Sequence, residues 1–315
     1  MFLNRQSLGR IAFNMHPARG PWGGSSPFVV QLKHYLQKRG YDVCFDLKKK
    51  VDVIVLIDPR DDLQFKSFGM DEIRAYKKDN PKVKVLHRIN ECDQRKNSSF
   101  MDELLKNANE IADHTVFIAN WLQDYHSERW FNKDNSHSVI YNGADPNVFH
   151  PIGSAIYDDK EAFRIVSHHW SDNMLKGFDI YSKIDQAIER GQLEGVELWI
   201  VGRWPSEIKW NETRLFPPSQ GKKLADTLRS CHAYVTASRW EPCGMHHVEG
   251  AQCGLPLLYH TDGGGIVEAG ERYGLGFGDD DFIDAIKSLR DEYGKYRNLV
   301  LNNSPCGDRM VMEYT

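Results

Sequence analysis

Short apolar runs alternate with amphipathic segments along the whole chain. The apolar runs predict strands, and segments with apolar positions three or four residues apart predict helices. In the first half we expect strands at 11–15, 41–46, 51–58, 84–89 and 114–118, and helices at 28–38, 71–78, 100–112 and 121–130. In the second half we expect strands at 163–167, 196–201, 233–236 and 255–259, and helices at 177–190, 221–230, 282–293 and from 308 onward.

This alternation predicts an α/β fold with parallel sheets and right-handed crossovers. The rhythm restarts after residues 138–151, SVIYNGADPNVFHP, where a strand ends at Asn142-Gly143 and an extended stretch with prolines follows. We interpret this segment as an interdomain linker, although a turn of this kind also occurs between unrelated domains. With 315 residues and 41% hydrophobic content, the chain is long enough for two domains with cores of their own.

Composition narrows the function classes. The net charge of −4 argues against nucleic-acid binding, which usually requires a basic surface. The six cysteines are scattered without a C-x-x-C pair, which favours free thiols in a reducing cytoplasm. We find no signal-peptide pattern and no apolar run approaching the roughly 20 residues of a membrane span. We therefore expect a cytoplasmic protein, and leave open weak peripheral contact with the inner face of a membrane.

The most informative segment spans 233–268 and reads AYVTASRWEPCGMHHVEGAQCGLPLLYHTDGGGIVE. It predicts a strand, a turn, a helix, a second strand and a glycine turn at 263–265. Glu241 and Glu249 are eight positions apart, and a helix would separate them by up to roughly 12 Å. This is about the span from the sugar to the ribose of a folded nucleotide-sugar. Such a pair arises easily by chance, so the weight lies on the ordered context around it.

That context resembles retaining glycosyltransferases of family 4. The patterns S-x-x-E-P-x-G, E-A-x-x-x-G-x-P and G-G-x-x-E follow one another from Ser238 to Glu268, and N-G-x-D-x-x-x-F-x-P matches from Asn142 to Pro151. The resemblance implies the GT-B fold, with two Rossmann-like domains whose parallel sheets face each other across a cleft. It implies an acceptor-side domain at 1–143, a nucleotide-sugar donor domain at 144–305 and a crossover helix at 306–315.

The resemblance also implies roles for individual residues. Glu249 is expected to bind ribose hydroxyls and Glu241 the hydroxyls of the transferred sugar. Lys176 is expected to meet the diphosphate, and the amides around Gly244, Met245 and His246 the sugar and phosphate. In the family an Arg about five residues upstream usually joins this Lys, and here it is missing. His168, Ser171, Asn173, Arg203 and Arg239 are candidates to replace it, and an exposed lysine at a helix start is the alternative for Lys176.

Further donor-site candidates lie at the ends of predicted strands. Gly23 and Gly24 precede a helix, where glycines allow close approach to a phosphate, but a plain N-cap by Ser25 or Ser26 explains the turn as well. The turn is not G-x-G-x-x-G, so the NAD fingerprint fails. Arg203 and Trp204 follow strand 196–201 at the sheet edge where α/β sheets bind ligands. Trp204, and Phe216 after it, are equally plausible as base-stacking or packing residues.

In the first domain, His87 is the catalytic candidate, because the resemblance implies a histidine near the anomeric centre. A hydrogen-bonded structural histidine is the alternative. The acceptor-side candidates are Trp22, Asn90, Glu91 and Arg95. We expect no metal and no cofactor, because the pairs His168-His169 and His246-His247 lack metal-ligand spacing and residues 279–281 precede a helix.

The expected function is that of a retaining, metal-independent glycosyltransferase. It would move a hexose-type sugar from a nucleotide-sugar, with UDP favoured over GDP, to a glycan or lipid-linked acceptor in polysaccharide biosynthesis. Two alternatives stay open: a catalytically inactive nucleotide-sugar-binding protein, suggested by the missing Arg, and a GT-B sugar-nucleotide epimerase. The sequence does not define the donor base, the sugar, the acceptor, the linkage or the oligomeric state.

Overall fold

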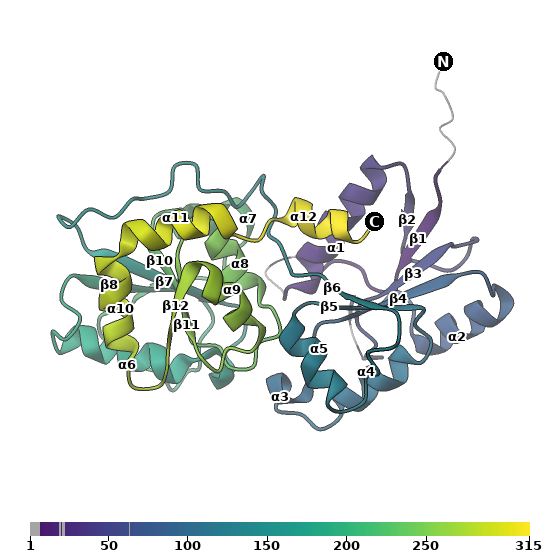
Figure 1. Cartoon of the computed structure of the whole chain (residues 1–315), viewed down its shortest axis with the longest axis horizontal. Coiled ribbons are helices and arrows are strands. Elements are labelled where there is room, and N and C mark those ends of the chain that lie inside the picture. The colour runs from purple at the N-terminus through teal and green to yellow at the C-terminus, as the bar shows by residue number, and fades with distance from the viewer. Residues whose placement is uncertain (1–6, 19, 21–22, 63) are drawn as a thin grey trace, which may run out of the picture. The chain divides into compact units, whose positions relative to one another are not determined.

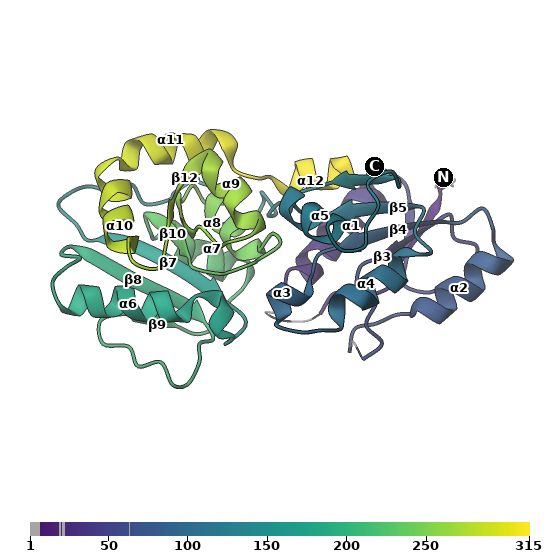
Figure 2. The ribbon, with the colours of Figure 1, turned by 60° about the horizontal axis from the view of Figure 1, so that its bottom comes forward.

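The chain forms two compact units. The computed structural model describes residues 7–18, 20, 23–62 and 64–315. Unit 1 comprises the described residues up to Tyr141 together with Val311–Thr315, and unit 2 comprises Asn142–Met310. Each unit is built on one parallel six-stranded sheet with helices packed against it (Figures 1 and 2).

In unit 1 the strand order is β2-β1-β3-β4-β5-β6. The strands are β1 (Arg10–Phe13), β2 (Asp42–Cys44), β3 (Val53–Leu56), β4 (Lys84–Ile89), β5 (His114–Phe117) and β6 (His137–Val139). The helices are α1 (Ser25–Lys38), α2 (Met70–Asp79), α3 (Asp93–Lys96), α4 (Met101–Asn109) and α5 (Asn120–Ser127). The order reverses between β1 and β3, and open α/β sheets bind ligands at the carboxyl ends of strands at such a switch point.

In unit 2 the strand order is β12-β11-β10-β7-β8-β9. The strands are β7 (Phe163–His169), β8 (Val196–Gly202), β9 (Arg214–Phe216), β10 (Ala233–Thr236), β11 (Leu257–His260) and β12 (Gly274–Phe277). The helical segments are η1 (Met174–Lys176), α6 (Phe178–Glu189), α7 (Gly221–Arg229), α8 (Met245–Gln252), α9 (Gly265–Tyr273), α10 (Phe282–Asp291), α11 (Tyr293–Asn303) and α12 (Gly307–Glu313), the last of which crosses into unit 1. Here the switch point lies between β7 and β10.

The helices form because each buries one apolar stripe against its sheet. In α6 the buried residues Phe178, Tyr181, Ile184 and Ala187 recur every three residues and join one core cluster with β7, β8 and β10. Full burial of such a side chain stabilises the fold by about 1.5–3 kcal/mol. This packing fixes the sheet, and the sheet fixes where its strand ends present polar side chains.

The predicted order of strands and helices agrees with the structure, with six additions. The segments β9, β12, α3, η1, α9 and α11 were not predicted. β12 contains Gly274 and Gly276 and so offers no apolar run, while α9 begins at Gly265 inside what was expected to be only a glycine turn. Among the helices of the described residues, none combines the length and apolar character needed to cross a bilayer.

The linker motif around Asn142 is explained by close packing within unit 2. The Asn142 side-chain amide donates to the Cys243 carbonyl at 2.7 Å, inside the turn that leads to α8. The Gly307 N–H donates to the Ala144 carbonyl at 2.8 Å. A Cβ on Gly143 would lie 2.3 Å from the Cys306 carbonyl oxygen, closer than real contacts allow. Glycine is therefore required at 143 because two backbone segments touch there.

We expect Gly143→Ala to destabilise unit 2 by roughly 2 kcal/mol or more, because backbone must move to admit the methyl group. Gly294→Ala is the matched control, since Gly294 is inside α11 and its added Cβ would meet no atom within 4 Å in the described part of the chain outside its own helix backbone and neighbours. The control should be neutral or stabilising by up to about 1 kcal/mol, as alanine favours helix. Urea unfolding followed by circular dichroism measures both, and equal effects would refute the close-packing argument.

Candidate donor site

The candidate site lies at the carboxyl ends of β7 and β10 in unit 2. Two loops leave the sheet here, one running from His169 to η1 and the other from Thr236 to α8. They are joined by backbone: the Arg239 N–H donates to the Leu175 carbonyl at 2.9 Å. Gly177, with φ of 88°, lies so close to Ala237 that a Cβ would come within 2.3 Å of the alanine Cβ. The lysine and glutamate segments are thus held at a fixed spacing.

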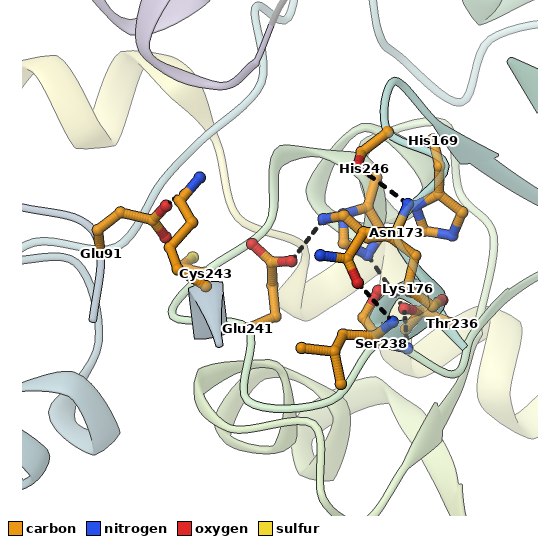
Figure 3. Close-up of polar contacts among 12 residues, drawn as sticks. Glu91, His169, Asn173, Lys176, Thr236, Ser238, Glu241, Cys243 and His246 are labelled. Atoms are coloured by element: carbon orange, nitrogen blue, oxygen red, sulfur yellow. Dashed lines mark hydrogen bonds and ion pairs between the residues drawn. The ribbon is translucent and has the colours of Figure 1, made fainter. Parts of the chain in front are cut away.

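Lys176 and Glu241 form an ion pair across these two loops. The Lys176 Nζ lies 2.6 Å from Glu241 Oε2, and the side chains are 12% and 13% exposed. Figure 3 shows the two side chains pointing toward one another beside His246 and Thr236. Because both groups are largely withdrawn from water, their attraction is screened less than that of a surface pair. The pair brings together two of the three residues predicted to be catalytic.

The backbone positions Glu241 on both sides. Trp240 has φ of 53°, a left-handed conformation that costs a bulky residue about 1–2 kcal/mol. Its N–H donates to the Asp262 carbonyl at 2.8 Å, and the Glu241 carbonyl accepts the Gly265 N–H at 2.9 Å. Strain of this kind persists only where the surroundings hold it, and here it aims the Glu241 side chain toward Lys176.

Glu249 lies in α8 with its carboxylate nearly buried. Its Oε2 is 2.8 Å from His168 Nε2, and His168 has no exposed surface. The helix begins at Met245 after Gly244, so its first backbone N–H groups have no partner within the helix. The His246 ring turns back into unit 2 and meets Thr236 Oγ1 at 3.0 Å, and burial lowers its pKa well below the usual range. We therefore expect His246 to contact a ligand through its backbone N–H and not through its ring.

Most substitutes for the missing Arg are already engaged. Arg239 donates to both oxygens of Asp179, at 3.0 and 2.9 Å, and to Asp279 at 2.6 Å. His168 holds Glu249, and the Asn173 side chain accepts the Leu175 N–H at 2.8 Å. These contacts argue against a phosphate role for the three side chains.

Ser171 and Arg203 are the remaining candidates. The Ser171 hydroxyl accepts the Asn173 N–H at 3.2 Å. Arg203 is exposed, and its Nη1 donates to the Trp170 carbonyl at 2.9 Å. Trp204 packs partly buried against the core of unit 2, which favours its packing interpretation over base stacking. A donor role for Arg203 stays a prediction.

The unit 1 candidates lie at two strand ends. Gly23 and Gly24 precede α1, and the Ser25 hydroxyl at the start of that helix accepts a hydrogen bond from Asn90 Nδ2 at 3.1 Å. Asn90 therefore connects the end of β4 with the start of α1.

The other acceptor-side candidates extend from this point. Glu91 forms an ion pair with Lys96, and Arg95 in α3 is 7% exposed. Trp22 lies outside the described residues. The acceptor-side roles of these residues stay predictions.

His87 is placed differently from what a catalytic role needs. It lies within β4 with no exposed surface, and its Nδ1 is 3.0 Å from Asn109 Oδ1. Burial lowers its pKa to about 4. This burial favours the alternative of a structural histidine, and a catalytic role for His87 stays a prediction. Position along the chain alone does not indicate which face of the strand the imidazole occupies.

Comparisons with known proteins identify the class. Residues 169–292 match the family model described as glycosyl transferases group 1. The search of curated proteins found no match. Sucrose-phosphate synthase from Thermosynechococcus elongatus is similar at TM-score 0.71 and 15% identity, with 97% of each chain covered. HepE from Anabaena in complex with UDP-glucose is similar at TM-score 0.69 and 14% identity, covering 97% of this chain and 98% of that one.

A third similar structure is the catalytic domain of starch synthase IV from Arabidopsis thaliana, bound to ADP and acarbose. It has TM-score 0.67 and 11% identity, with 98% of both chains covered. Unit 2 therefore contains a glycosyl transferases group 1 domain, and the chain has the fold of GT-B glycosyltransferases. The predicted fold class and the predicted enzyme class, glycosyltransferase, are confirmed.

The buried histidines of the site make unit 2 sensitive to acid. His247 has no exposed surface, and neither of its ring nitrogens has a hydrogen-bond partner among the described residues. Burial lowers its pKa to about 4. Unfolded histidine takes up a proton near pH 6.5. Between about pH 6.5 and 4 the unfolded state therefore binds more protons, and the free energy of unfolding falls as the pH is lowered.

We expect His247→Leu to reduce this pH dependence by up to about 1.4 kcal/mol per pH unit, the contribution of one proton. At pH 8 the imidazole is neutral in both states, so the difference between variant and wild type there isolates packing. Urea unfolding at pH 8, 6 and 5 gives the slope. An unchanged slope would show that His247 takes up its proton in the folded state.

Proposed function

We propose that the chain is a retaining, metal-independent glycosyltransferase of family 4. It transfers a hexose-type sugar from a nucleotide-sugar, with UDP favoured and GDP second, to a glycan or lipid-linked acceptor. The observation that carries the proposal is the Lys176–Glu241 pair at the switch point of a glycosyl transferases group 1 domain.

The pair combines the two functions that the reaction needs. Departure of the sugar leaves a nucleoside diphosphate, whose developing charge requires fixed cations or N–H dipoles. Lys176 supplies the cation, and the first amides of α8 at Gly244, Met245 and His246 supply the dipoles. Glu241, an acceptor of hydrogen bonds, binds hydroxyls of the transferred sugar. A lysine and a helix start in these positions do the work that a divalent cation performs elsewhere, which supports metal independence.

We infer from the resemblance to family 4 that the anomeric configuration of the transferred sugar is retained. In the proposed step the bond between the sugar C1 and the phosphate oxygen breaks. The acceptor oxygen then bonds to C1 on the same face, and the acceptor proton passes to the leaving phosphate. This course requires no protein base at the acceptor, so the enclosed position of His87 is compatible with it.

The donor assignment rests on the ribose, which several nucleotides share. We assign Glu249, which lies in α8, to the ribose, which UDP, GDP and ADP have in common. HepE was solved with UDP-glucose and starch synthase IV with ADP, and we favour UDP for this chain. An acceptor from polysaccharide biosynthesis, and a cytoplasmic location with weak peripheral membrane contact, complete the proposal.

The first experiment is a thermal-shift screen in EDTA against UDP, GDP, ADP and their common sugars. A ligand that binds only the folded state raises its stability. A shift with one nucleotide class identifies the base, and its loss in Glu249→Ala supports the ribose assignment. No shift with any nucleotide would contradict the proposed donor class.

We expect Glu241→Gln and Lys176→Met each to lower kcat/KM for sugar transfer on the order of 10²–10³-fold. Lys176→Met removes the cation that meets the developing charge of the diphosphate, and Glu241→Gln weakens the acceptor that holds the sugar hydroxyls. Lys222→Met is the matched control, since that side chain is 84% exposed and forms a surface pair with Asp226 on α7. Product analysis by mass spectrometry distinguishes transfer from epimerisation. Wild-type rates in both site variants would overturn the assignment of this pair.

A further inference from the structure

Glu249 is the end of a buried hydrogen-bonded relay. The His168 Nε2 lies 2.8 Å from Glu249 Oε2, and Tyr234 lies behind the histidine with its hydroxyl 3.1 Å from His168 Nδ1. His168 and Tyr234 have no exposed surface, and Glu249 is 7% exposed. The three residues come from β7, β10 and α8, so the relay joins the two switch-point strands to the helix that carries the carboxylate.

The shortest contacts indicate which atom carries each proton. The Tyr234 oxygen accepts the backbone N–H of His168 at 2.9 Å. Its single proton has two acceptors within reach, His168 Nδ1 at 3.1 Å and the His168 carbonyl at 3.4 Å, and the shorter contact is the one to Nδ1. Burial raises the pKa of this phenol well above its usual range, so the proton stays on it. With Nδ1 acting as acceptor, the imidazole proton is on Nε2 and is donated to the carboxylate. Tyr234 therefore selects the tautomer that holds Glu249.

The residue after Glu249 is adapted to this relay. A Cβ on Gly250 would lie 2.3 Å from Cδ2 and 2.7 Å from Cγ of Tyr234. Any larger residue at 250 would displace the tyrosine ring from the position where its hydroxyl reaches His168. Gly250 lies inside α8, where glycine costs about 1 kcal/mol relative to alanine, and packing against Tyr234 accounts for its presence.

We propose that His168, held by Tyr234, is a positioning residue that orients Glu249 to accept hydroxyls from the vicinal diol of the donor ribose. This proposal rests on the proposed donor site. With Oε2 fixed by His168, the carboxylate cannot rotate freely, and Oε1 is presented in one direction. The consequence is selectivity for ribonucleotides over deoxyribonucleotides, because a fixed acceptor gains a bond from a hydroxyl that the deoxy compound lacks.

The test compares the Kd of UDP with that of 2′-deoxy-UDP by isothermal titration calorimetry on the full chain, with GDP and ADP pairs measured in parallel. Wild type should bind the ribonucleotide about tenfold more tightly, the effect of one hydrogen bond to a charged group. His168→Ala should reduce the ratio to within about twofold of one. His168→Gln should retain most of it, because the glutamine amide can donate from the place of Nε2.

Two further variants separate positioning from folding. Tyr234→Phe leaves His168 in place but frees its tautomer, and should lower the ratio without abolishing binding. His232→Ala removes another fully buried histidine of unit 2, one that contacts Arg164 and Glu161, and should keep the wild-type ratio. If His168→Ala does not fold, the test uses the other two variants. His168→Gln should keep the ratio of the two Kd values, and Tyr234→Phe should lower it.

The outcomes distinguish this inference from the proposed function. Wild type that binds none of the nucleotides would overturn the donor site itself. Wild type that binds UDP and 2′-deoxy-UDP equally, or a His168→Ala variant that discriminates as well as wild type, would overturn the positioning role and leave the donor site standing.

Discussion

The candidate site depends on the contact between Gly177 and Ala237. Only a residue without a side chain can adopt φ of 88° and approach the backbone of the neighbouring loop this closely. The contact sets the spacing of the loops that follow β7 and β10, and the bond from Arg239 to Leu175 closes them together. The side chains of Lys176 and Glu241 meet at 2.6 Å because these backbone contacts already hold the two loops at a fixed distance. The electrostatics of the site is a consequence of backbone packing.

Charge in this region is organised by burial. The carboxylates of Asp179 and Asp279 share Arg239, Glu241 binds Lys176, and the His168 imidazole binds Glu249. A buried charge is costly unless it is paired or hydrogen-bonded, and the largely buried Glu241 and Glu249 each have such a partner. The Arg239 cluster joins Asp179 of α6, and Asp279 just before α10, to the loop that carries Glu241.

The sequence predicted the strands, helices and loops, which depend on local pattern. It did not predict the partners of individual side chains, which depend on residues far apart in the chain. Apolar periodicity located the long strands and helices, and the motif from Ser238 to Glu268 located the switch-point loops in the correct unit. The burial of the His87 imidazole was not predicted, because helices cover the sheet and the sequence does not indicate which side chains of β4 they enclose. Arg239 looked available from its position, yet two aspartates distant in sequence neutralise it. The partnership of His168 with Glu249 had no local signal, because it is made by residues 81 positions apart.

The path of the chain adds a consequence for biosynthesis. Residues Val311–Thr315 belong to unit 1, although the whole of unit 2 precedes them. Within unit 1 the ring of Tyr314 packs against Phe28 of α1 at a centroid distance of 5.1 Å. A ribosome synthesises Phe28 before the residues of unit 2 and Tyr314 after them. This part of the surface of unit 1 therefore acquires its final packing only after the second unit has been synthesised.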